Sequence, residues 1–157
     1  MNFENPTHLI SEDKNSLGRA ETLIDARGPR FGAAITVLVL TLAIVLKEPL
    51  LLIWQAVAFG MGATFGPQRT PYAFIFKTLV KPRLTGPVPT EDVRPPQFAQ
   101  AVGFLFALFA LLGVAIGSDL TFFIATGFAL AAAFLNSAFD FCLGCEMYLL
   151  LTRAFKR

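Results

Sequence analysis

Runs of uncharged, mostly apolar residues alternate with charged segments along the chain. A helix needs about 20 residues to cross the ~30 Å hydrocarbon core of a bilayer, and the runs approach or reach that length. The first run is the shortest, but Arg30 and Lys47 at its ends can extend their charged groups toward the two membrane surfaces. The pattern predicts four transmembrane helices, at about residues 30–47, 49–66, 98–117 and 120–139.

The connections within each pair of predicted helices are very short. A Lys-Glu dipeptide separates the first two runs, and a Ser-Asp dipeptide separates the last two. Such connections hold neighbouring helices antiparallel. We therefore predict an all-α fold: an integral membrane four-helix bundle of two helical hairpins. It forms a single membrane domain over residues 28–157, preceded by a polar tail over residues 1–27.

Small residues recur at four-residue spacing within the predicted helices. In lipid such residues mark contact faces, because helix association there depends on close van der Waals packing rather than on the hydrophobic effect. The pattern fits contacts within the bundle and oligomerisation equally well. The examples are Ala58-Gly62-Gly66, Ala56-Gly60-Thr64, Gly113-Gly117 and Ala125-Ala129-Ala133-Ser137.

The middle connection contains an amphipathic segment at residues 71–81. Thr70 can cap a helix that starts at Pro71, and Lys77 and Lys81 flank its apolar stripe. The pattern predicts an interfacial helix on the inner membrane surface, with its lysines near the lipid phosphates. A short helix packed on the ends of the bundle is the alternative. The stripe consists of Tyr72, Ile75, Phe76, Leu79 and Val80.

Lys and Arg residues are concentrated on one side of this topology. The N-terminal segment, the middle connection and the C-terminus contain 12 of the 13, and the opposite side has only the lysine of the first hairpin. Segments rich in Lys and Arg stay in the cytoplasm, so both termini and the middle connection are predicted to be cytoplasmic. Residues that would anchor the protein at that membrane surface are Arg27, Arg30, Lys77 and Lys81.

Composition supports a membrane protein and argues against two other classes. Apolar residues make up 55% of the chain and charged residues 15%, which is too little charge to cover a soluble domain of 157 residues. No dense basic stripe with interleaved aromatic residues lies outside the membrane-flanking segments. The lipid bilayer is therefore an expected partner, and nucleic acid is not.

The two cysteines, Cys142 and Cys145, form a C-x-x-C pair just after the fourth predicted span. The predicted topology places them at the cytoplasmic face, where a reducing environment disfavours a permanent structural disulfide. If the chain breaks near Gly144, a helix over about residues 145–155 follows, and its N-terminus would stabilise the Cys142 thiolate. The two main interpretations are an exchanging thiol pair and two inert packing residues.

Three polar residues flank the cysteine pair. Asp140 and Glu146 carry negative charge, which raises the pKa of a nearby thiol and opposes thiolate formation. Asn136 shares a predicted helix face with Asp140, and polar groups at this depth either serve a function or tie helices together. We take Cys142 and Cys145 as candidate catalytic residues, and Asn136, Asp140 and Glu146 as supporting polar residues.

A metal site within one chain is not predicted. Two cysteines supply half of a tetrahedral zinc shell, and His8 in the tail is the only other soft ligand. A four-cysteine shell would need two chains. The sequence has no glycine-rich phosphate loop and no Ser/His/Asp set, so no cofactor is predicted, and whether the protein is an enzyme stays open.

Four segments resemble a bacterial membrane family known as domain of unknown function 4395. The resemblance implies an integral membrane protein of the bacterial inner membrane with a C-x-G-C near its end. It also implies association with thioredoxin-like and sulfurtransferase proteins, which favours thiol or sulfur chemistry. The segments are IDARGPRFGAAIT, PYAFIFKTLVKPRL, RPPQFAQAVG and AAAFLNSAFDFCLGCEMYLLL.

Three functional hypotheses follow. The first is a thiol or sulfur relay, in which Cys142 attacks and Cys145 resolves. The second is a non-catalytic accessory or scaffold subunit of a larger membrane complex. The third is a passive channel or solute carrier formed by oligomerisation, for which Asn136 and Asp140 are the candidate lining residues.

Overall fold

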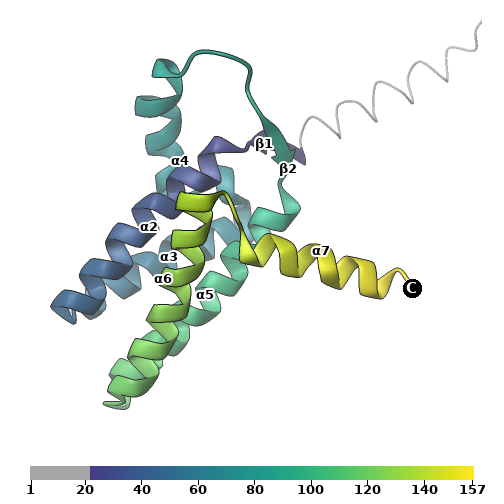
Figure 1. Cartoon of the computed structure of the whole chain (residues 1–157). Helices are drawn as coiled ribbons and strands as arrows, with labels where there is room; N and C mark the ends of the chain where they lie inside the picture. The colour runs from purple at the N-terminus through teal and green to yellow at the C-terminus, as the bar shows by residue number, and fades with distance from the viewer. Residues whose placement is uncertain (1–21) are drawn as a thin grey trace, which may run out of the picture.

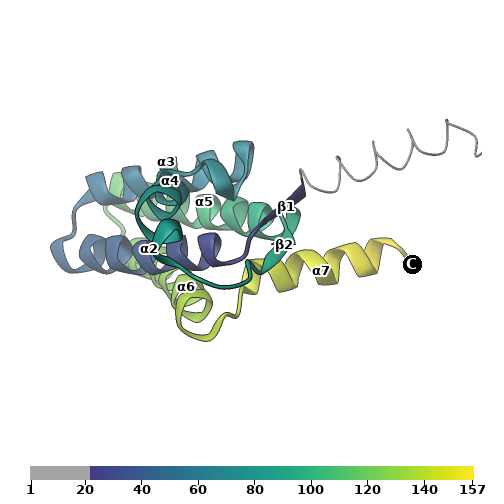
Figure 2. The ribbon, with the colours of Figure 1, turned by 90° about the horizontal axis from the view of Figure 1, so that it is seen from above.

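The computed structural model describes residues 22–157, and four long helices form a ring. Helix α3 packs on α5, α5 on α6, α6 on α2, and α2 on α3. Figures 1 and 2 show these four helices side by side, with α7 leading away to one side. The all-α bundle prediction is confirmed. The helices are α2 (Arg27–Leu46), α3 (Pro49–Phe65), α5 (Arg94–Ala115) and α6 (Asp119–Phe139).

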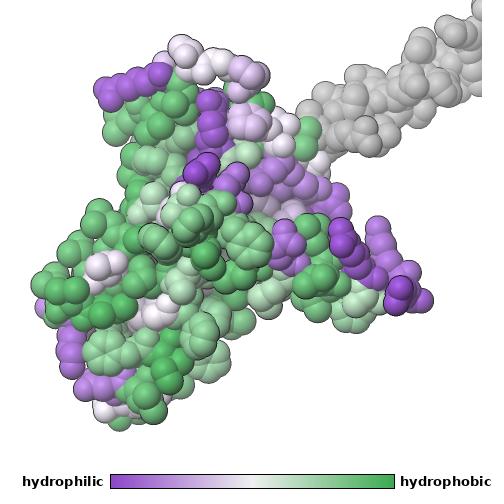
Figure 3. All heavy atoms as spheres, in the orientation of Figure 1, coloured by the Kyte–Doolittle hydropathy of each residue, from purple (hydrophilic) through white to green (hydrophobic). Residues whose placement is uncertain are grey.

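The outer surface of the ring is apolar. Side chains such as Val45, Leu120 and Phe128 are more than 60% exposed, and Figure 3 shows hydrophobic residues covering most of the visible bundle surface. Helices α2, α5 and α6 are long and apolar enough to cross a membrane, whereas α3 is apolar but has 17 residues. These features are those of a membrane protein, because a soluble monomer rarely exposes continuous apolar surface of this extent.

The two hairpin turns lie together at one end of the bundle. Lys47, in the left-handed region with φ of 51°, ends α2, and α3 begins at Pro49. The Lys47 Nζ lies 3.5 Å from Asp119 Oδ2 in the second hairpin and 5.4 Å from the centre of the Phe123 ring. The N-terminal segment, the middle connection and the start of α7 therefore lie toward the opposite end.

Helix backbones in the ring approach closely at small residues. A Cβ atom on Gly113 would lie 2.6 Å from the backbone nitrogen of Phe122, and one on Gly103 would lie 2.9 Å from the Phe59 ring. The buried centre of the ring is accordingly built of small and medium side chains and one phenylalanine. They are Leu40, Ala43, Leu52, Ala110, Phe122, Ala125 and Ala129.

The middle connection starts with a 3-10 turn, η1 (Pro67–Arg69), followed by α4 (Pro71–Ile75). Helix α4 continues as a π-helical turn, η2 (Phe76–Val80), and a 3-10 turn, η3 (Lys81–Arg83). The Thr70 hydroxyl accepts a hydrogen bond from the Ala73 N–H at 3.1 Å and caps α4. Of the predicted stripe, Tyr72 and Phe76 are buried, and the Phe76 ring lies 5.7 Å from that of Phe31 in α2. Ile75 and Leu79 are exposed, so one part of the stripe packs on the bundle and the other part faces outward. Contact of this outer part with the membrane surface stays a prediction.

A buried chain of hydrogen bonds attaches α4 to α2 and α3. Tyr72 Oη donates to Gln55 Oε1 at 2.8 Å, and Gln55 Nε2 donates to Thr36 Oγ1 at 3.1 Å. Trp54 Nε1 donates to Tyr72 Oη at 3.0 Å. Gln55 is fully buried, and the chain provides partners for both ends of its amide, which would otherwise be costly at this depth.

A short antiparallel ladder joins the N-terminal segment to the middle connection, and the sequence pattern does not predict it. Strand β1 (Leu23–Asp25) pairs with β2 (Thr90–Asp92), with Ile24 opposite Glu91. The predicted N-terminal tail lies mostly outside the described residues. Its final residues form β1 and the start of α2, which begins at Arg27 rather than near residue 30.

Gly113→Ala should lower the free energy of unfolding by about 1–3 kcal/mol, because the new methyl group meets the α6 backbone. The matched control is Gly127→Ala, whose Cβ would meet nothing within 4 Å, and which should be neutral or slightly stabilising. Thermal unfolding in detergent micelles measures both. Equal melting temperatures would contradict close packing at Gly113.

Tyr72→Phe should lower the free energy of unfolding by about 1–3 kcal/mol, because Gln55 Oε1 loses its donor in a buried site. The control is Thr78→Val, which removes only exposed bonds of a side chain to its own helix. Chemical denaturation followed by Trp54 fluorescence reports both variants. A Tyr72→Phe protein as stable as Thr78→Val would show that the network adds nothing.

Candidate functional site

The chain breaks sharply between the fourth long helix and the C-terminal helix α7 (Leu143–Phe155). Helix α6 ends at Phe139, and Asp140 adopts a left-handed conformation with φ of 56°. The N–H groups of Asp140 and Phe141 both donate to the carbonyl of Leu135, which closes the end of α6. The break therefore lies at Asp140, four residues before Gly144, the position at which the sequence left a break open.

Gly144 serves packing rather than chain reversal. It lies within the first turn of α7, where a Cβ atom would be 2.6 Å from both the Cα and the Cβ of Ala99 in α5. Only a residue without a side chain allows α7 to approach α5 this closely. The rings of Phe98 and Tyr148, whose centres are 5.8 Å apart, extend the same contact. Helix α7 is thus held against the start of α5.

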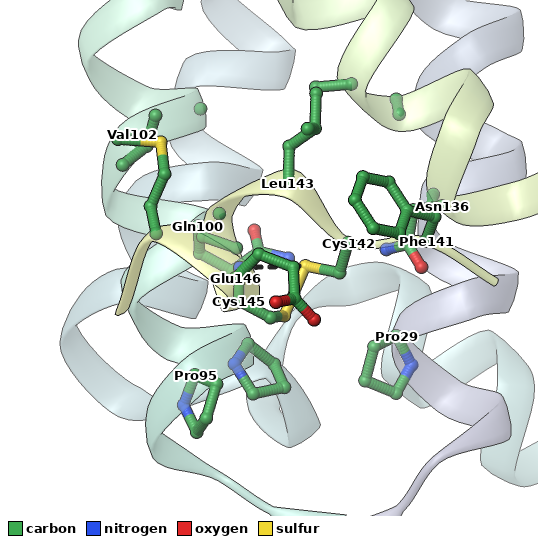
Figure 4. A pocket seen from close by; sticks show the side chains of 18 of the residues that line it. Pro29, Pro95, Gln100, Val102, Asn136, Phe141, Cys142, Leu143, Cys145 and Glu146 are labelled. Carbon is green, nitrogen blue, oxygen red and sulfur yellow. Dashed lines mark hydrogen bonds between the residues drawn. A yellow bond between two sulfur atoms is a disulfide. The ribbon is translucent and has the colours of Figure 1, made fainter. Parts of the chain in front are cut away.

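Cys142 is the N-cap residue of α7. Its Sγ accepts a hydrogen bond from the Cys145 N–H at 3.3 Å, and the Cα atoms of the two cysteines are 5.2 Å apart. The two sulfur atoms are joined in a disulfide bond (Figure 4). Helix N-terminal N–H groups and the helix dipole stabilise negative charge at this position, so a thiolate released at Cys142 would be stabilised.

The disulfide forms part of the wall of a cavity of about 550 Å³. Apolar residues from α2, α5 and α6 line most of it, and the ring of Phe141 lies near Cys142 in Figure 4. The polar residues Gln100 and Asn136 contribute from α5 and α6. Carboxyl groups that line the cavity come from Glu91, Asp92, Asp140 and Glu146, and none of its described lining residues is a Lys or Arg.

All five predicted site residues thus line one cavity. Asp140 and Glu146 are exposed, whereas Asn136 and the two cysteines are partly buried. The prediction that Asn136 and Asp140 share a helix face is wrong, because Asp140 lies just beyond the end of α6. The break in the chain, rather than helical spacing, brings their side chains to the same cavity.

Glu91 is a further acidic group of the cavity that the sequence reasoning missed. Its side chain is half-buried and has no hydrogen-bond or ion-pair partner among residues 22–157. Burial, and to a smaller extent the negative charge of Asp140, raise the pKa of the Glu91 carboxyl to about 7. The residue lies in a Pro-rich connection, where no periodic pattern indicates which side chains are buried.

The four predicted anchoring residues make contacts at the end of the bundle where this cavity lies. Arg27 Nε and a terminal nitrogen donate to Asp25 at 3.0 Å each, which holds the pKa of the Asp25 carboxyl below its usual range. Lys81 Nζ lies 3.8 Å from the same carboxylate. Arg30 donates to the Ser137 carbonyl at 3.1 Å, and Lys77 to the Gln68 carbonyl at 2.9 Å. Whether they also contact lipid remains a prediction.

The described part of the chain contains no cluster of three or more metal-ligating side chains. His8, the third soft ligand considered above, lies outside the described residues.

A family model described as "Domain of unknown function (DUF4395)" matches residues 24–153, which include the bundle, the break and the cysteine pair. No curated protein and no solved structure matches the chain. The comparisons therefore name a family and no activity.

Glu91→Gln should make the protein more stable above neutral pH. The folded state holds this carboxyl neutral up to about pH 7, whereas the unfolded chain ionises near pH 4.5, so wild-type stability falls as pH rises between these values. Because the group is only half-buried and screened by water, we expect a difference of roughly 2–4 °C in Tm between pH 5 and pH 8. Thermal unfolding at both pH values measures it, and equal pH dependence in both proteins would contradict the burial of Glu91.

Proposed function

The chain belongs to the DUF4395 family, and we propose that it acts as a membrane thiol relay. In this role Cys142 and Cys145 alternate between a disulfide and a dithiol. A relay exchanges two electrons with a partner, or passes a sulfur atom between partners. The observation that carries the proposal is a disulfide at the N-terminus of α7, in the wall of an open cavity.

The position of the pair supports an exchanging disulfide over an inert one. A purely structural bond that closes a loop of a few residues adds little stability, because the entropy that it removes from the unfolded chain is small. The bond is partly exposed rather than sealed in the core. A helix N-terminus lowers the pKa of a thiol. At neutral pH such a thiol is more often a thiolate, which is the form that attacks and the form that leaves in disulfide exchange.

The reaction balances within the cysteine pair and a partner dithiol. A partner thiolate bonds to Cys142 Sγ, the Cys142–Cys145 bond breaks, and Cys145 Sγ keeps the electron pair. The second partner sulfur then displaces Cys142 as a thiolate. The partner dithiol is oxidised to a disulfide and the pair in this chain is reduced. In sulfur transfer the same Cys142 thiolate would attack the outer sulfur of a partner persulfide. A persulfide then forms on Cys142, the partner's sulfur–sulfur bond breaks, and the partner cysteine leaves as a thiolate.

We also propose that the protein lies in the bacterial inner membrane and exchanges with a partner on the cytoplasmic side. The excess of Lys and Arg in the N-terminal segment, the middle connection and the C-terminus favours a bacterial inner membrane protein with both termini and the cysteine pair on the cytoplasmic side. On that side thiols are kept reduced, so an isolated disulfide would be turned over. A thioredoxin-like or sulfurtransferase protein is the partner that this chemistry and the family resemblance favour.

A scaffold role is the second candidate, and α7 favours it. None of its 13 residues is buried, and its apolar side chains include Leu150 at 62% and Phe155 at 87% exposure. Such a helix could dock on another subunit or rest on the membrane surface. This role requires neither cysteine, so a Cys142→Ser, Cys145→Ser double variant would keep full function.

Cys145→Ser should trap a mixed disulfide between Cys142 and an oxidised partner. The free Cys142 thiolate attacks the partner disulfide, in the reverse of the reaction above, and the Cys145 thiol that would resolve the adduct is absent. Affinity purification from membranes, followed by non-reducing electrophoresis and mass spectrometry, detects the adduct. The Cys142→Ser variant is the matched control and should trap nothing. Equal, slow alkylation of both reduced thiols, together with no adduct in either variant, would refute the relay and favour the scaffold.

A further inference from the structure

The cavity contains an acidic group that the relay as described above does not use. Glu91 lies on β2 and lines the same cavity as the two cysteines. The ladder fixes the strand on both sides of it: the Ala26 N–H donates to the Pro89 carbonyl at 2.9 Å, and the Val93 N–H to the Thr22 carbonyl at 2.8 Å. The Glu91 carboxyl therefore sits on a fixed backbone rather than on a free loop.

We propose that Glu91 is the proton donor and acceptor of the Cys142–Cys145 pair. The inference rests on the proposed relay and extends it by one group. Three observations support it. Glu91 lines the same cavity as the two cysteines, the ladder holds its backbone, and its side chain has no hydrogen-bond or ion-pair partner among residues 22–157.

The other acidic groups around the cavity are less suited to this task. Asp140 and Glu146 are exposed to solvent, so the cavity does not enclose either side chain. Asp92 accepts a hydrogen bond from the Arg94 N–H at 2.9 Å and lies 3.4 Å from the Arg94 guanidinium, so its carboxylate already has a partner. The nearby Asp25 is likewise paired with Arg27. Among the residues that the structure describes, Glu91 is the acidic group of the cavity that is partly buried and has no hydrogen-bond or ion-pair partner.

The electrostatic setting suits proton exchange near neutral pH. Burial and the charge of Asp140 raise the pKa of Glu91 to about 7, and no cation lines the described cavity wall to oppose this. A group that is half-protonated at the working pH is an effective acid and an effective base. Neutral Glu91 also adds no negative charge beside the thiolate that forms at Cys142.

In the proposed cycle Glu91 gives a proton to Cys145 and takes one from the partner thiol. When a partner thiolate attacks Cys142 Sγ, the departing Cys145 sulfur takes the proton of the Glu91 carboxyl and becomes a thiol. The Glu91 carboxylate accepts the proton of the second partner thiol as that thiol attacks. Cys142 leaves as a thiolate at the N-terminus of α7. The partner dithiol becomes a disulfide, this chain holds one thiol and one thiolate, and Glu91 is protonated again.

The test uses the full chain in lipid nanodiscs with dithiothreitol as the dithiol probe. The measured quantity is the rate of disulfide reduction divided by the concentration of dithiothreitol thiolate, between pH 5 and pH 9. For the wild type this corrected rate should fall about 10-fold or more as pH rises through about 7, because the acid form of Glu91 is lost. For Glu91→Gln it should be low and independent of pH.

Three further variants sharpen the result. Glu91→Asp should keep a pH-dependent step, which separates loss of the acid from damage to the fold. Asp140→Asn should move the step to lower pH, because the charge that raises the Glu91 pKa is removed. Glu48→Gln, an exposed carboxyl in the opposite hairpin turn, should match the wild type.

The outcomes separate the inference from the relay. A disulfide that dithiothreitol reduces, with the same pH step in Glu91→Gln as in the wild type, would overturn the role of Glu91 and leave the relay standing. A disulfide that resists reduction in every variant at every pH would overturn both.

Discussion

The structure depends on close approach of helix backbones at a few residues without large side chains. In lipid, the burial of apolar side chains between helices gains little free energy, because the lipid tails are apolar as well. Helices therefore associate where their backbones can come into direct contact. Gly113 allows α5 to meet α6, and Gly103 accommodates the Phe59 ring of α3. These contacts, with the buried hydrogen bonds of Gln55, hold the ring together where the hydrophobic effect cannot.

The same constraint positions the candidate site. Gly144 lies against Ala99, so the first turn of α7 rests on the start of α5. Asp140 turns the chain before that contact, and Cys142 caps the helix that follows. The disulfide, the helix N-terminus and the cavity are therefore results of one packing contact and one unusual backbone conformation. A membrane bundle thereby gains a polar, partly enclosed site at one end without placing a charge in its centre.

Sequence patterns predict the helices and turns of this protein, which have a local period or signal. They miss features that arise from contacts between segments distant in sequence. Helical runs and two-residue turns predict the hairpins, and small-residue spacing predicts contacts such as that of Gly113. The break at Asp140 escapes prediction because aspartate rarely adopts φ above zero, and Gly144 nearby is the stronger breaker signal. Glu91 escapes because its burial arises from a ladder between segments distant in sequence, which no local pattern reveals.

The register of the β1–β2 ladder determines which side chains of β2 face the cavity. Side chains alternate between the two faces of a strand, so a slip of one residue in the pairing of Ile24 with Glu91 would turn Glu91 to the opposite face. An insertion or deletion of one residue within β2 itself would therefore take Glu91 out of the cavity wall. The longer segment before Thr90 can change in length without this effect, because a loop absorbs such changes and leaves the pairing in place.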